Sequence, residues 1–157
     1  MEATRVPDNA MPLPQNSYAE QVVLAGCMRD AKALARVRYF VHEEDFGRPE
    51  NQMIWRAIEE AAAHGPVNPE TVAAVLRKWG RLEEVGGLMD LLAEIPTDVL
   101  PFAGVVVDTS LRRRLVLLAR DLEAAAYAPV SSADEVLAEH LRRVVELVQD
   151  RLLRAIS

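Results

Sequence analysis

Apolar residues recur every three or four positions through most of this chain, which is the spacing of an amphipathic α-helix. Between the helical stretches lie prolines, glycines and small polar residues that mark where helices begin and end. Strict alternation of β-branched residues is absent except at positions 105–107, and these sit inside a helical period. The pattern therefore predicts an all-α fold, with a compact bundle of about five or six helices followed by a C-terminal antiparallel helical hairpin.

The first two thirds of the chain predict the bundle. Ser17 and Glu20 have the spacing of a capping box, in which each side chain binds the other residue's backbone amide, so the first helix is expected to begin there. Ahead of it, residues 1–16 contain three prolines and no apolar period, which predicts a flexible leader. Helices are expected at 18–29, at 31–41, from Pro49 to a stop at Gly65, from a cap at Asn68 to Gly80, and at about 88–95.

The last third of the chain predicts two long helices. One is expected from about 101 to 128 and the other from 132 to 156, where Ser132 and Glu135 form another capping box. The short connection between them forces the two helices to run antiparallel. The chain is therefore expected to divide into the leader 1–16, a globular bundle 17–100 and a hairpin 101–157.

Each hairpin helix carries a stripe of leucines and valines three or four residues apart. Further apolar residues, among them Leu117, Val136 and Leu147, widen both arcs beyond what one partner helix covers. We therefore expect the stripes to pack partly inside the hairpin and partly against another molecule, so that the hairpin drives dimerisation. The candidate seam residues are Leu111, Leu115, Leu118 and Leu122 on the first helix and Leu137, Leu141, Val144, Val148 and Leu152 on the second.

Composition and charge narrow the classes of function. The 157 residues, half of them hydrophobic, suit one domain with a substantial core. The formal net charge of −6 repels nucleic acid, so no direct binding to duplex DNA is expected. Cys27 is the only cysteine, and neither a signal segment nor an apolar run of membrane-spanning length occurs, so we expect a cytoplasmic protein without membrane contact.

Charged clusters offer few candidates for catalysis. The acidic runs 43–45, 59–60 and 83–84 are interpreted as solvated helix edges, because adjacent helical residues diverge by about 100°. No histidine has a second ligand at zinc spacing and Cys27 has apolar neighbours, so we expect no catalytic residue, metal or cofactor. For the basic cluster 112–114 we favour ion pairs within the helix or between subunits over phosphate contact.

Five short motifs follow one another in a fixed order. They are Pro14 with AEQVVLAGCM at 19–28; FGRP at 46–49 with Ile54, Trp55 and Ile58; GPVN at 65–68 with Thr71, Val72 and Leu76; VGG at 85–87 with LLAEI at 91–95; and FAGVV at 102–106. In this order they resemble the N-terminal domain of DnaB-type replicative DNA helicases, and the likeness extends from about Pro14 to Ile156. Asn51 departs from it, since the family often has a histidine there.

The resemblance implies a role in assembling the helicase. In the family, hairpins pair two subunits, three pairs form a ring, and the surface receives the C-terminal helicase-binding domain of the primase. A linker then leads to a RecA-like ATPase domain, which is absent from these 157 residues. The implied function is oligomerisation and primase interaction in DNA replication, with DNA unwinding in the full-length ring. Two alternatives stay open: a free-standing modulator of a helicase encoded elsewhere and, more distantly, a small all-α enzyme with a carboxylate site.

The chain lacks a phosphate-binding loop, since no G-x-x-x-x-G-K-[ST] run occurs in it. We expect the purified protein to show no DNA-stimulated ATPase and no ATP-dependent unwinding, because no such loop cradles the nucleotide phosphates. Phosphate release with and without single-stranded DNA, measured in a preparation free of other helicases, checks this. Turnover above the buffer blank would refute it.

Overall fold

The computed structural model describes residues 11–85, 88, 90, 92 and 94–156. In these residues the regular structure is helical, without a strand, which confirms the predicted all-α class. The predicted helix at 88–95 includes positions 89, 91 and 93 and so lies in part outside the described residues. The elements are α1 (Ser17–Arg29), α2 (Ala31–Val37), the 3-10 turn η3 (Glu43–Asp45), α3 (Pro49–His64), α4 (Pro69–Lys78), the 3-10 turn η4 (Leu82–Val85), α6 (Leu100–Tyr127) and α7 (Ala133–Ile156).

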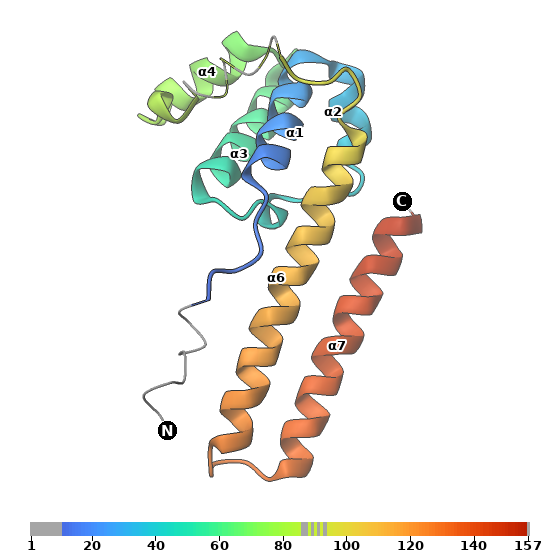
Figure 1. Ribbon diagram of the computed structural model, residues 1–157. Coiled ribbons are helices and arrows are strands. Elements are labelled where there is room, and N and C mark those ends of the chain that lie inside the picture. Colours follow the sequence, from blue (N-terminus) through green and yellow to red (C-terminus); the bar gives the residue numbers. More distant parts are fainter. Residues whose placement is uncertain (1–10, 86–87, 89, 91, 93, 157) are drawn as a thin grey trace.

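Helices α1 to α4 gather around one end of α6, and the rest of α6 projects away from them with α7 beside it (Figure 1). The two long helices run antiparallel, as the short connection between them requires, and α7 ends beside the bundle. The first turns of α6 belong to the bundle core, because Ala103, Val106 and Val107 are buried there. One continuous helix therefore carries the hairpin out of the bundle.

Helix α1 is the central helix of the bundle and is buried on nearly every side. It packs against α6 at a close approach, where a Cβ added to Gly26 would stand only 2.4 Å from Cγ1 of Val99. A larger residue at Gly26 would therefore push the start of α6 away from α1. Val22, Val23, Leu24 and Met28 of α1 are fully buried and belong to the core.

Local capping signals predicted most helix starts. Asn68 caps α4 by accepting from the Thr71 amide at 2.8 Å, and at α7 Ser132 and Glu135 bind each other's amides at 3.1 and 2.9 Å. The hydrogen bonds at Ser132 lower the pKa of the Glu135 carboxyl. Helix α2 ends at Val37, four residues earlier than predicted, where the chain tightens into a turn.

The predicted capping box at Ser17 is wrong. Asn16 caps α1 instead, with its side-chain oxygen 2.9 Å from the Ala19 amide. Glu20 is buried and accepts from the Gly47 amide and the Asn51 side chain, each at 2.7 Å. Two hydrogen bonds to a buried carboxylate stabilise more than one exposed amide contact would, and tertiary packing therefore decides where Glu20 points.

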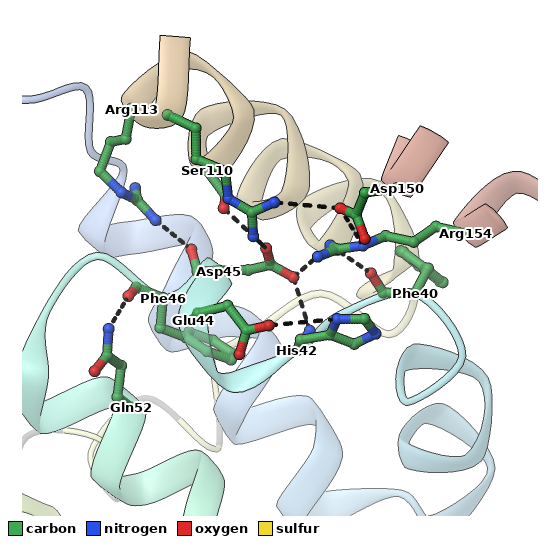
Figure 2. Close-up of polar contacts among 11 residues, drawn as sticks. Phe40, His42, Glu44, Asp45, Phe46, Gln52, Ser110, Arg113, Asp150 and Arg154 are labelled. Atoms are coloured by element: carbon green, nitrogen blue, oxygen red, sulfur yellow. Dashed lines mark hydrogen bonds and ion pairs between the residues drawn. The ribbon is translucent and has the colours of Figure 1, made fainter. Parts of the chain in front are cut away.

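The carboxylate of Asp45, only 1% exposed, joins the bundle to the hairpin (Figure 2). Its Oδ1 accepts from the Ser110 hydroxyl at 2.8 Å and from Arg114 at 3.2 Å, both on α6. Its Oδ2 accepts from Arg154 of α7 at 2.7 Å and from the His42 amide at 2.7 Å. We call Asp45, Ser110, Arg114, Asp150 and Arg154 the polar joint.

Asp150 closes the polar joint from the α7 side. Its Oδ2 lies 3.2 Å from Arg114 and 3.2 Å from Arg154, so a carboxylate stands on each side of both guanidinium groups. Arg154 also donates to the Phe40 carbonyl at 3.2 Å. The joint therefore connects α6, α7, η3 and the turn after α2, with each buried charge facing one of opposite sign.

The polar joint overturns two predictions. Asp45 is not a solvated helix edge, although its neighbour Glu44 is exposed as expected. In the basic cluster, Arg112 pairs within α6 with Asp108 at 2.8 Å, as favoured. Arg113 and Arg114 instead bind Asp45 within the same molecule. Arg113 donates to the Asp45 backbone carbonyl and Arg114 to its carboxylate, because both side chains leave α6 on the sides that reach η3, away from Arg112.

The polar joint predicts an asymmetry between two adjacent carboxylates. Asp45→Ala should lower the free energy of unfolding by about 3–5 kcal/mol, because it leaves Arg154 without its buried partner. Urea unfolding followed by circular dichroism measures this. The matched control is Glu44→Ala, an exposed position where a change within about 0.5 kcal/mol is expected. Equal effects of the two substitutions would contradict the joint's structural role.

Candidate protein-interaction surface on the hairpin

The two hairpin helices contact each other through a narrow strip. Leu118 of α6 and, nearer the connection between the helices, Val136 and His140 of α7 are buried along this strip. The His140 ring is held by Nδ1, 2.8 Å from the Val136 carbonyl oxygen. Farther along the hairpin the helices are linked by ion pairs, with Arg143 2.9 Å from Asp121. The internal contact of the hairpin is therefore mixed, part apolar and part charged.

The predicted seam on α7 does not lie in this internal strip. Leu137, Leu141, Val144, Val148 and Leu152 are between 41% and 65% exposed. The expectation that these residues pack inside the hairpin is wrong, because the stripe is rotated by about 100° from the positions that meet α6. The expectation that they meet another molecule stays a prediction.

The α6 stripe divides between the inside and the outside of the hairpin. Leu118 is buried and Leu111 is half-buried, whereas Leu115 and Leu122 are exposed. With 100° per residue and the helices antiparallel, Leu115 and Leu122 lie on the same side of the hairpin as the α7 stripe. We call the nine candidate seam residues together the apolar face.

The other side of the hairpin is more polar. There a groove of about 400 Å3 is lined by Leu117, Arg143, Leu147, Glu146 and Asp150, among others. Solvent-exposed ion pairs continue along α7, with Arg142 2.6 Å from both Glu139 and Glu146. The hydrogen bond from Arg142 is the main cause that lowers the pKa of the Glu139 carboxyl. The hairpin thus presents one apolar and one charged side.

Residues that could carry chemistry are separated in space. Cys27 is buried in α1, and burial, with the charges of Glu59 and Asp30, raises the pKa of its thiol to about 12. Glu60 and His64 form an exposed pair, 3.7 Å apart, on α3. Within the part of the chain that the structure describes, no three His, Cys, Asp or Glu side chains come together as metal ligands. The described helices include none that could span a bilayer.

A second hollow, which sequence reasoning missed, lies where the end of α7 approaches the bundle. It is a groove of about 530 Å3 lined by Arg36, Tyr39 and Phe40 from α2 and the turn after it, Gly104 and Val107 from α6, and Arg151 from α7, among others. These residues come from three parts of the chain, so no local motif marks them. We call this hollow the basic groove.

Comparisons with known proteins agree with this geometry. A family model described as the DnaB-like helicase N-terminal domain matches residues 12–106. The replicative DNA helicase DnaB of Geobacillus stearothermophilus is 34% identical over 142 residues, which make up 87% of this chain and 31% of that protein. The DnaB of Mycobacterium leprae is 33% identical over 147 residues, covering 88% of this chain and 24% of that protein.

A solved structure shares the fold. The crystal structure of the N-terminal domain of DnaB helicase from Mycobacterium tuberculosis matches with a TM-score of 0.77 at 30% identity, and covers 86% of this chain and 99% of that one. The chain thus spans less than a third of the length of the two full-length relatives but nearly all of the isolated domain. On both sequence and fold, this chain belongs to the family of DnaB-like helicase N-terminal domains.

Proposed function

We propose that this domain joins subunits of a replicative DNA helicase through the apolar face of its hairpin. The observation that carries the proposal is the exposure of seven of the nine residues of that face in a single molecule. Each Å2 of apolar surface removed from water stabilises an association by about 25 cal/mol. A contiguous stripe of leucine and valine that is left in water is typical of a surface that a partner covers.

A second hairpin is the partner that fits this face. Two antiparallel hairpins laid face to face form a four-helix arrangement, whose core positions recur three and four residues apart as they do here. A two-fold axis uses the same face on both subunits, so it leaves no apolar stripe uncovered. We propose a dimer and, at high concentration, a trimer of dimers, which is the collar that the family forms.

The helicase-binding domain of the primase is the second partner that we propose. Its support is membership of the family, together with the surface that remains after the apolar faces have paired. That surface includes the groove beside Leu117 and Leu147 on the charged side of the hairpin. DNA unwinding would belong to the full-length ring in the cytoplasm, and this domain would supply assembly and recruitment.

A charge in the apolar face should abolish self-association. Val148→Glu places a carboxylate in the proposed seam, where burial without a partner costs on the order of several kcal/mol. We expect the unsubstituted protein to sediment as a dimer or larger at tens of micromolar and the variant to sediment as a monomer. Circular dichroism of both must be the same, so that lost assembly is not mistaken for unfolding.

The adjacent position supplies the matched control. Gln149 is exposed and points about 100° away from Val148 around α7, so Gln149→Glu adds the same charge outside the apolar face. Its assembly should equal that of the parent. The proposal fails if the unsubstituted protein is a monomer at tens of micromolar, or if Val148→Glu assembles as well as Gln149→Glu.

Primase recruitment is tested separately from self-association. The C-terminal domain of the cognate primase should release or absorb heat on titration and should protect the hairpin between Leu111 and Leu152 from hydrogen exchange. Absence of both signals would contradict the proposal that this domain binds primase. A change in the ATPase rate of a full-length helicase after adding the domain in trans would then favour the free-standing modulator.

A further inference from the structure

The basic groove lies apart from the apolar face and is formed where three segments meet. Figure 1 shows the end of α7 approaching α2 and the first turns of α6, which form its walls. Phe40, Val107 and the ring of Tyr39 make the lining mainly apolar, and Tyr39 is itself 66% exposed. A hollow of about 530 Å3 with such a lining has the size and character of a ligand site.

Two positive charges in the groove are left without a partner. Arg36 and Arg151 are exposed, and neither forms an ion pair or side-chain hydrogen bond with any described residue. Arg154, at the back of the groove, differs because Asp45 and Asp150 already neutralise it. Acidic residues outnumber basic ones in this chain, 24 to 18, yet none of those that the structure describes is paired with these two guanidinium groups.

Gly104 gives a second, independent indication. It lies in the second turn of α6, where glycine is less stable than alanine by roughly 0.5–1 kcal/mol. Packing within the fold does not require it, because a Cβ added there would meet no described atom within 4 Å. The missing side chain instead leaves the floor of the basic groove open, which is the usual reason for glycine where a ligand approaches a backbone closely.

We propose that the basic groove binds an acidic peptide segment of a partner protein, with its carboxylates on Arg36 and Arg151 and an aromatic or branched apolar side chain over Gly104. Guanidinium groups bind carboxylates in paired, charge-assisted hydrogen bonds. The apolar lining favours a peptide, which brings an apolar side chain of its own, over a free anion, which does not. This surface is additional to the hairpin contact of the proposed function and does not depend on it.

A peptide fits these observations better than nucleic acid does. Single-stranded nucleic acid is held by a row of cations that follows its backbone, whereas this groove offers two unpaired charges on different segments. The net charge of −6 also repels an extended polyanion at long range. A peptide with one or two carboxylates beside an apolar residue is attracted locally without that penalty.

The test is a titration of the isotope-labelled protein with the acetylated peptide Gly-Asp-Phe-Asp-Leu-Gly, followed by NMR and by calorimetry. Amide shifts are expected in α2, the first turns of α6 and the last turns of α7. Arg36→Glu and Arg151→Glu should each weaken binding about tenfold or more, since each removes a charge-assisted contact. Gly104→Leu should abolish binding by filling the floor while the protein keeps its helices.

Arg77→Glu is the matched control, because Arg77, like Arg36, is an exposed arginine in the last turn of a helix but lies outside the groove. It should leave binding unchanged. The proposal is overturned if millimolar peptide causes no shifts in the groove, if a lysine version binds equally well, or if oligothymidylate displaces the peptide from it. It is also overturned if Arg36→Glu changes the sedimentation of the protein alone, since a second copy would then be the occupant.

Discussion

The buried carboxylate of Asp45 is the interaction on which the arrangement of this domain depends. It receives Arg114 from α6 and Arg154 from α7 while its own backbone belongs to the bundle. Apolar contacts alone would let a projecting hairpin slide or rotate, because they have no preferred direction. Charge-assisted hydrogen bonds have a preferred direction, and removal of Asp45 leaves Arg154 without its buried partner. The polar joint therefore fixes the direction in which the hairpin leaves the bundle.

Because the polar joint anchors α7, α6 and α7 need only a small buried contact along the rest of the hairpin. Among the α7 residues whose burial the structure describes, Val136 and His140 are buried, and ion pairs such as that between Arg143 and Asp121 supply further contacts. The leucines and valines of the α7 stripe are thus not buried by contacts within the molecule. They remain available for the association that we propose, on a helix whose position is already set.

The same anchor creates the basic groove. Arg154 holds the last turns of α7 against the bundle through Asp45 and the Phe40 carbonyl. One turn earlier on the same helix, Arg151 is thereby brought to the groove that Arg36 also lines. The apolar face and the basic groove are separate surfaces, but both exist because one buried carboxylate positions α7.

The sequence alone determined the helices and their order, because proline, asparagine, glycine and paired capping residues act locally. It determined the hairpin too, since so short a connection between two long helices leaves only an antiparallel return. It could not decide which arc of α7 faces inward, because the more apolar arc is the exposed one and the inward arc is held by ion pairs to residues distant in the sequence. Nor could it reveal Asp45, which stands in an acidic run like other solvated runs, or the basic groove, whose residues extend from Arg36 to Arg154. Those features depend on contacts between distant segments, so only the tertiary structure decided them.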